Sequence, residues 1–151
     1  MRHKILVPHD GYEMSDKALN YAIEIAKAMD MEITVLRVLP EIIEGSSLFL
    51  SEKERERVKR ELSRVSKEVQ KKVYDSLEKQ VNVCESKGVR ASRMVLVGEP
   101  VEKILSVANK EDPFLIIIGS RRLKGLGKLK VLGSVARKVS EQAKCPVTIV
   151  H

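Results

Sequence analysis

Short apolar segments alternate with helical patterns along this 151-residue chain, and the alternation constrains its fold more than any other feature. The segments are rich in Val, Ile and Leu and have the length of buried strands. They are residues 4–8, 32–39, 91–97, 114–118 and 146–150. Because a helix separates each pair of successive strands, the strands are expected to run parallel, with right-handed crossovers and helices on both faces. The sequence therefore predicts an α/β fold, a three-layer α/β/α sandwich around a five-stranded parallel sheet.

Four helical patterns fill the intervals between these strands. Ser15 is the predicted N-cap of the first helix and Ser134 that of the last, because serine is a favoured N-cap residue. The second pattern predicts one amphipathic helix over residues 51–86, with Gly88 just past its end. Its apolar positions recur at the spacing of one helix face: Val58, Leu62, Val65, Val69, Val73, Leu77, Val81 and Cys84. This face is expected to lie against the protein, with the charged face in solvent.

The composition, 43% hydrophobic and 32% charged residues, is ordinary for a globular protein. No repeat or linker divides the sequence, so a single domain over residues 1–151 is expected. The most apolar stretch, residues 114–118, is far shorter than the roughly 20 residues that cross a bilayer. The N-terminal apolar run is too short for a signal peptide. These features predict a cytoplasmic protein that does not contact the membrane.

The cysteines and histidines do not suggest a metal site. Cys84 and Cys145 are the only cysteines and lack the spacing of a zinc site or a redox pair. Two reduced, buried thiols are the expected state. His3 and His151 lie near the chain ends, without companion ligands.

The net charge of +7 is concentrated in one segment. Residues 114–140 contain seven basic residues and no acidic one, whereas the rest of the chain holds 21 of each kind. Such a focused charge attracts an anion or a polyanion. It is equally typical of a solvated loop. With aromatic residues at only 3%, stacking on single-stranded nucleic acid is disfavoured.

In a parallel sheet of this type, ligands bind beyond the carboxyl ends of the strands, where the strand order reverses. The loops that follow Pro8, Leu39, Val97 and Ile118 are therefore the candidate binding loops. The last of these contains several glycines and basic residues. It leads to a helix start at Gly133 and Ser134, where free N–H groups favour an anion. A phosphate cradle and an ordinary loop with a serine N-cap both fit this pattern.

Several nucleotide and hydrolase motifs are absent. The chain contains neither a P-loop nor a G-x-G-x-x-G motif after its first strand. The third strand ends in Val95-Leu96-Val97-Gly98, without the aspartate of a receiver domain, and no G-x-S-x-G nucleophile elbow occurs.

The remaining motifs resemble those of the universal stress protein family, in the right order over essentially the whole chain. They are Val7-Pro8-His9-Asp10-Gly11 with Ser15 and Ala18-Leu19, then Val35-Leu36-Arg37-Val38, Val97-Gly98-Glu99-Pro100, Ile116-Ile117-Ile118-Gly119-Ser120-Arg121, Leu132-Gly133-Ser134-Val135 and Ala143-Lys144-Cys145-Pro146-Val147.

This resemblance implies a Rossmann-like fold of the adenine nucleotide alpha hydrolase type and a homodimer formed through the last strand, at Val147 and Ile149. One branch of the family binds ATP. The cofactor that the resemblance implies for this chain is ATP, with Mg²⁺. Carried over, Asp10 would approach the ribose and the Val38 backbone the adenine, while Gly119 and its loop would hold the phosphates. The nucleotide-binding residues implied are Pro8, Asp10, Val38, Gly98, Gly119, Arg121, Arg122, Gly133, Ser134 and Val135.

The loop departs from the family's ATP motif, which is Gly, two residues, Gly, nine residues, Gly and then Ser or Thr. Arg122 replaces the second glycine, and ten residues, 123–132, precede Gly133. Either Gly125 or Gly127 takes over the missing role and the arginines bind phosphate, or the site has decayed. Two functions follow: a regulator that binds ATP or a related adenine nucleotide without strong catalysis, or a dimeric interaction protein that binds none.

Two residues at the end of the first strand have contrasting expected roles. Asp10 is expected to be a ligand contact, with an Asx turn to Gly11 as the alternative. His9 is expected to point to the opposite side of the strand and to pack in the turn. No residue is assigned a catalytic role, because no carboxylate or histidine is clearly placed to activate water at the Gly119 loop.

Overall fold

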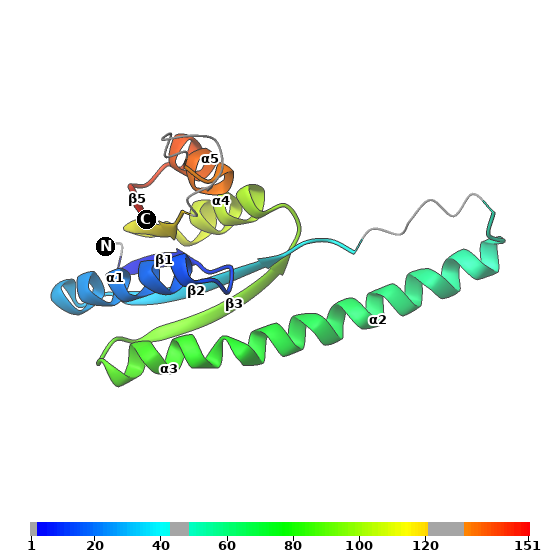
Figure 1. The fold of residues 1–151 in the computed structure, drawn as a ribbon, viewed down its shortest axis with the longest axis horizontal. Helices are drawn as coiled ribbons and strands as arrows, with labels where there is room; N and C mark the ends of the chain where they lie inside the picture. Colours follow the sequence, from blue (N-terminus) through cyan, green and yellow to red (C-terminus); the bar gives the residue numbers. More distant parts are fainter. Residues whose placement is uncertain (1–2, 43–48, 121–131) are drawn as a thin grey trace.

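A computed structural model describes residues 3–42, 49–120 and 132–151. Its five strands form one sheet in which every neighbouring pair is parallel. They are β1 (Lys4–Pro8), β2 (Glu32–Leu39), β3 (Ala91–Val97), β4 (Leu115–Gly119) and β5 (Val147–Val150). The predicted α/β fold is confirmed, and Figure 1 shows the helices on both sides of the sheet.

The strand order is β3-β2-β1-β4-β5. The chain therefore adds strands outward on one side of β1, then returns to its other side for β4 and β5. Ile5 pairs with both Ile33 of β2 and Leu115 of β4, so β1 lies at the centre of the sheet. The reversal between β1 and β4 is the place where this topology positions a ligand.

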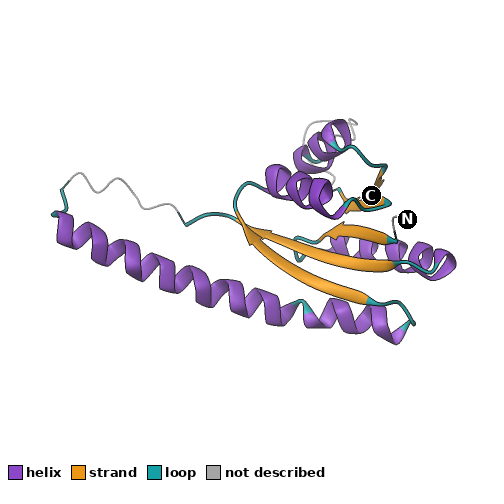
Figure 2. Cartoon of the chain, turned by 180° about the vertical axis from the view of Figure 1, so that it is seen from behind, coloured by secondary structure: helices purple, strands orange, loops and turns teal. Residues whose placement is uncertain are grey.

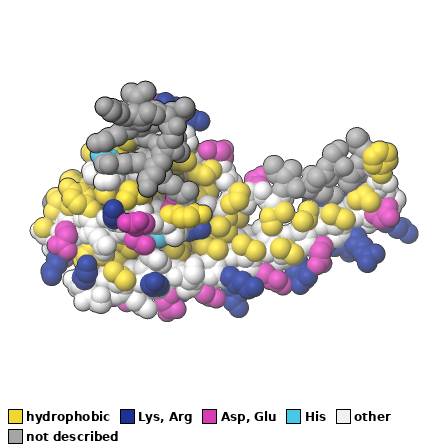
Figure 3. Space-filling model, in the orientation of Figure 1, with side chains coloured by type: hydrophobic (Ala, Val, Ile, Leu, Met, Phe, Trp, Pro, Cys, Tyr) yellow, Lys and Arg dark blue, Asp and Glu magenta, His cyan; other side chains and the backbone are white. Residues whose placement is uncertain are grey.

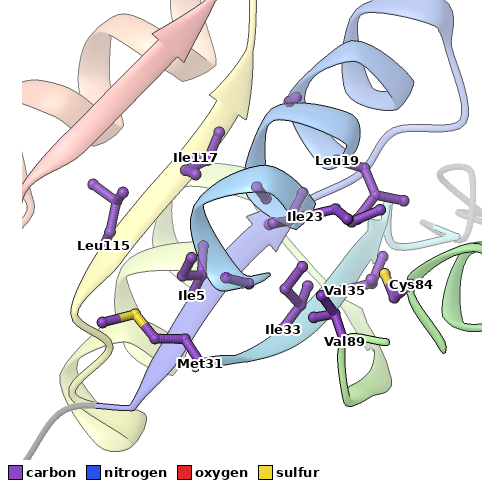
Figure 4. Packing of buried hydrophobic residues seen from close by; sticks show 14 of the residues in the cluster. Ile5, Leu19, Ile23, Met31, Ile33, Val35, Cys84, Val89, Leu115 and Ile117 are labelled. Carbon is purple, nitrogen blue, oxygen red and sulfur yellow. The ribbon is translucent and has the colours of Figure 1, made fainter. Parts of the chain in front are cut away.

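Two apolar cores, one on each face, hold the layers together. Helix α1 (Glu13–Met29) packs on one face through Leu19 and Ile23, as Figure 4 shows. Helices α4 (Pro100–Glu111) and α5 (Ser134–Gln142) cover the other face, through Ile104 and Val139. Alternate residues of each strand enter the two cores in turn, which explains the near-continuous apolar runs in the sequence.

The structure corrects both predicted serine N-caps. Helix α1 has Tyr12 at its N-cap position, and Ser15 lies inside its first turn. The Ser15 hydroxyl instead contacts Asp10 in the preceding turn, which draws the helix start closer to β1. Helix α5 has Gly133 as its N-cap, and Ser134 is its first helical residue, without a side-chain capping bond.

The single helix predicted over residues 51–86 is two helices, α2 (Glu52–Ser76) and α3 (Glu78–Ser86), joined at the buried Leu77. Arg93 of β3 explains the break. Its guanidinium donates hydrogen bonds to the carbonyl oxygens of Tyr74 (2.8 Å) and Asp75 (3.3 Å), in the last turn of α2. A side chain from the sheet thus binds carbonyl groups that end one helix, a contact that local periodicity cannot indicate.

Helix α2 also extends beyond the sheet, as Figures 1 and 2 show. At 1.5 Å per residue it spans about 37 Å, against about 23 Å for β3, so the sheet cannot cover it. No residue of α2 is buried, and the prediction that its apolar face packs throughout is wrong. Apolar side chains follow one side of the helix and charged side chains the opposite side (Figure 3).

The start of α2 is fixed by a reciprocal cap. The Ser51 hydroxyl accepts from the Glu54 N–H, and the Glu54 carboxylate accepts from the Ser51 N–H at 2.7 Å. Hydrogen bonds from the Ser51 side chain and from the Ser51 backbone N–H to the Glu54 carboxylate lower the pKa of Glu54, because they favour its charged form. The cap allows this exposed helix to begin without tertiary contacts.

The two cysteines differ in environment. Cys84 is completely buried, and burial raises the pKa of its thiol to about 11, so the thiol stays protonated near neutral pH. Cys145 is half-buried, so the predicted burial holds only for Cys84, and neither cysteine forms a disulfide. Over the described residues, no helix has the length and apolar character of a membrane span.

Candidate functional site

A small cavity lies at the carboxyl ends of β1, β2 and β4, at the reversal of strand order. Its volume is about 150 Å³. Sites for whole drug-sized ligands enclose roughly 300–1,000 Å³, so this cavity fits one ring system, with the rest of a ligand outside. Its lining is Pro8, His9, Asp10, Ser15, Leu36, Val38, Pro100, Ile104, Ile118, Gly119 and Val135.

The cavity has an apolar interior and a polar rim. Leu36 and Ile118 come from strands and Ile104 comes from α4, and all three are buried. Asp10 and Ser15 supply the polar rim beside β1. An apolar slot with a few fixed polar groups at one end is typical of a site that buries a ring and orients it.

The turn between β1 and α1 holds Asp10 through a compact hydrogen-bond network. One carboxylate oxygen of Asp10 accepts from the Ser15 hydroxyl at 2.7 Å and from the Tyr12 N–H at 3.0 Å. The Asp10 N–H also donates to the Ser15 hydroxyl oxygen at 3.1 Å. The Asx turn considered for Asp10 is therefore present, and it fixes the carboxylate at the cavity rim.

The His9 side chain is buried and contacts α1, and it lines the same cavity as Asp10, not the opposite side as predicted. Its Nε2 lies 2.9 Å from Asp16 Oδ1 on α1, and its Nδ1 accepts from the Gly11 N–H at 3.1 Å. The His9 side chain therefore packs within the turn that carries Asp10.

At the far side of the cavity, Ser120 joins two segments that are distant in sequence. Its hydroxyl oxygen accepts from the Gly133 N–H at 2.8 Å, and its own N–H donates to the Val150 carbonyl of β5. Ser120 is also buried. This contact sets the start of α5 against the end of β4 and brings Val135 to the cavity.

Gly119, the last residue of β4, lies against the first turn of α1. A Cβ atom built there would be 2.6 Å from the Met14 carbonyl carbon and 3.0 Å from the Ser15 nitrogen. Since both are backbone atoms, neither can move aside as a flexible side chain would. Glycine is therefore needed here for the close approach of β4 and α1, whether or not a phosphate also binds nearby.

The first turns of α4 and α5, which both lie near the cavity, differ in electrostatics. The first turn of α4 is already capped, because the Glu99 carboxylate accepts from the Glu102 N–H at 2.7 Å. Within the part of the chain that the structure describes, helix α5 has no side-chain cap, and its first turn has no acidic residue. An anion would therefore be favoured at the start of α5, where the helix dipole is not already offset.

The structure brings together five of the ten residues implied by resemblance: Pro8, Asp10, Val38, Gly119 and Val135 line the cavity. Gly133 and Ser134 lie next to it, at the start of α5, outside the lining. Gly98 does not line it either, because it follows β3, the edge strand, and lies beside the Lys103 side chain. Arg121 and Arg122 lie outside the described residues.

Sequence reasoning did not assign site roles to Ser15, Leu36, Pro100, Ile104, Ile118 or Ser120. Ser15 and Ser120 belong to the family motifs, but local sequence patterns do not predict the contacts that they make with Asp10 and Gly133. Leu36 had an available signal, since it alternates with Val38 on the same side of β2.

A family model described as "Universal stress protein family" matches residues 1–151. The chain belongs to this family. It is 37% identical over 156 residues to the universal stress protein YxiE of Bacillus subtilis, and the match covers 100% of both chains.

Solved structures of universal stress proteins share this fold. Protein MJ0577 of Methanocaldococcus jannaschii matches with a TM-score of 0.78 and 25% identity, over 99% of this chain and 96% of that one. A universal stress protein in complex with cAMP has a TM-score of 0.70 at 20% identity, over 99% and 97%. One from Archaeoglobus fulgidus in complex with dAMP has a TM-score of 0.64 at 21%, over 100% and 98%.

Proposed function

We propose that this universal stress protein binds an adenine nucleotide at the cavity between β1 and β4 and acts as a regulator. The observation that carries the proposal is the cavity itself: a ring-sized apolar slot at the strand reversal, with Asp10 fixed at its rim. Two structural relatives bind cAMP and dAMP, which supports an adenine nucleotide as the ligand class.

Each part of a nucleotide matches a part of the site. The base would enter the slot between Leu36, Ile104 and Ile118, beside the backbone of Val38. The ribose would lie at Asp10, whose carboxylate accepts hydrogen bonds from donors such as sugar hydroxyls. The phosphates would lie toward the uncapped first turn of α5.

The site favours binding over chemistry. Asp10 and His9 already make hydrogen bonds within the β1–α1 turn, which holds them as structural groups. Among the described residues, no group of three potential ligands could hold a metal ion. Mg²⁺ would therefore enter with ATP, bound to its phosphates, and we expect no rapid hydrolysis.

Calorimetric titration tests the proposal directly. ATP, ADP and AMP, each with and without Mg²⁺, are expected to bind at one site per chain and to raise the melting temperature by mass action. GTP serves as the matched control, since it differs in the base, and should bind more weakly. Absence of heat and of any thermal shift with every adenine nucleotide at about millimolar ligand would contradict nucleotide binding and favour the nucleotide-free interaction protein.

We also propose that the chain forms a homodimer through β5. This strand is at the edge of the sheet, with Val147 and Ile149 half-buried. The carbonyl of Pro146 accepts from Ile116 of β4 and that of Val150 from Ser120, just after β4, so the backbone groups of Val147 and Ile149 point to the open edge. Pairing with a second copy would satisfy these groups and cover an exposed strand edge.

The substitution Ile149→Pro is expected to convert the dimer to a monomer, because it removes an outward N–H while leaving the bonds to β4. Sedimentation measures the state, and circular dichroism checks the fold. Ile149→Ala is the matched control: it shortens the same side chain, keeps the N–H and should remain dimeric. A dimer that persists in the proline variant would place the interface elsewhere.

A further inference from the structure

His9 connects the rim of the nucleotide site to helix α1. Its side chain is 1% exposed, and both ring nitrogens have partners. Nδ1 binds the backbone of Gly11, next to Asp10, and Nε2 binds Asp16 on α1. The ring therefore forms a bridge between the turn and the helix.

These contacts specify one protonation state of the ring. A backbone N–H can only donate, so Nδ1 must accept from Gly11 with its lone pair and carry no proton. The ring proton is then on Nε2, which donates to the Asp16 carboxylate. The geometry is that of a neutral imidazole with its proton on Nε2.

Protonation would oppose this geometry. A proton on Nδ1 would face the Gly11 N–H, placing two donors against each other. The charged groups around the ring act in different directions: Asp16 and Asp10 favour a cation, whereas the Arg37 guanidinium of β2, which lies against Gly11, disfavours one. The Gly11 contact is lost in the protonated form whichever of these influences is larger.

The position of Asp10 depends on this turn. Ser15 holds its carboxylate from the α1 side, and the Tyr12 N–H holds it from the turn. Gly11 lies between Asp10 and Tyr12, so a shift of the Gly11 peptide moves both the carboxylate and its donor. The Gly11 N–H of that segment donates to His9 Nδ1.

We propose that His9 is a positioning residue of the nucleotide site: its neutral ring holds the Gly11 peptide and thereby Asp10, and its protonation releases the turn and weakens nucleotide binding. This inference rests on the proposed function. It adds that nucleotide affinity depends on the protonation state of the His9 ring.

The first test needs no ligand. Long-range proton–nitrogen correlation spectra of the intact protein at about pH 8 are expected to show the His9 proton on Nε2, with a slowly exchanging Gly11 amide. A proton on Nδ1 instead would overturn the proposal, since the Gly11 bond could not then form.

The second test compares ATP binding by the wild type, His9→Asn and His9→Val at about pH 8 and about pH 5.5. An asparagine carbonyl takes the place of Nδ1 as acceptor and does not titrate, so at the higher pH this variant should bind ATP more tightly than His9→Val. Valine provides no acceptor and should weaken binding at least about fivefold at that pH.

The pH profile distinguishes positioning from packing. Between the higher and the lower pH, the ATP affinity of the wild type should fall at least about fivefold more than that of His9→Asn. ATP itself is protonated to the same extent in both titrations, so its protonation cancels from this comparison. Parallel weakening of both proteins would overturn the proposal, even if the valine variant fails to fold. If none of the three proteins binds ATP although the Nε2 proton is observed, the proposed function is contradicted. The role of His9 at the nucleotide site is then contradicted as well.

Discussion

Replacement of Gly119 by alanine is expected to destabilise the protein by about 3 kcal/mol, which lowers the melting temperature by about 6–12 °C. The added methyl group would meet the Met14 carbonyl and approach the Ser15 nitrogen at 3.0 Å, and both belong to the α1 backbone. Relief requires α1 to move away from β4, which opens the core around Leu19 and Ile23. Thermal and urea unfolding without nucleotide measure the effect.

Gly88→Ala is the matched control for this substitution. Gly88 has a positive φ of 80°, but an added Cβ would meet no atom within 4 Å. Only backbone strain of about 1 kcal/mol is expected there. If the two variants were equally stable, the close packing of Gly119 against α1 would not be the reason for glycine at this position.

Filling the cavity through Val38→Phe is expected to lower adenine nucleotide affinity at least about 100-fold, equivalent to about 2.7 kcal/mol. Val38 lines the cavity from β2, and the phenyl ring of the variant would occupy the 150 Å³ in which the base is proposed to lie. Phenylalanine is well tolerated in strands, so unfolding should change by less than about 1 kcal/mol. Calorimetry and urea unfolding of the same preparation separate the two effects.

Val95→Phe makes the same chemical change outside the cavity. Val95 is also half-buried and lies on β3, packed against the core on the opposite face of the sheet. Its variant should bind nucleotide like the wild type. Unchanged affinity in Val38→Phe would show that the base does not occupy this cavity.

The fold was predictable because strands and helices differ in apolar period. Residues 32–39 are mainly apolar, with residues 33–36 buried, and the structure makes them β2 with the predicted boundaries. The break at Leu77 was not predictable in this way. It depends on Arg93 of β3, which is distant from α2 in sequence and donates hydrogen bonds to carbonyls of its last turn in the folded structure.

In the candidate site, too, some residues could be predicted from the sequence and others could not. Pro8, Asp10 and Val38 could be proposed from the family resemblance, and they lie near the carboxyl ends of β1 and β2, which a parallel sheet places at one edge. Ile104 could not be distinguished from an ordinary core residue of its helix. Its place in the cavity follows from the packing of α4 over β2.

The sequence by itself determined the parallel sheet, the family and the edge at which ligands would bind, because strand periodicity and motif order are local properties of the chain. Tertiary structure alone decided the contacts: Ser120 with Gly133, His9 with Gly11 and Asp16, and Gly119 against Met14. Hydrogen bonds and van der Waals contacts act over only a few ångströms. Which side chains come within that range is therefore settled once the helices have packed on the sheet.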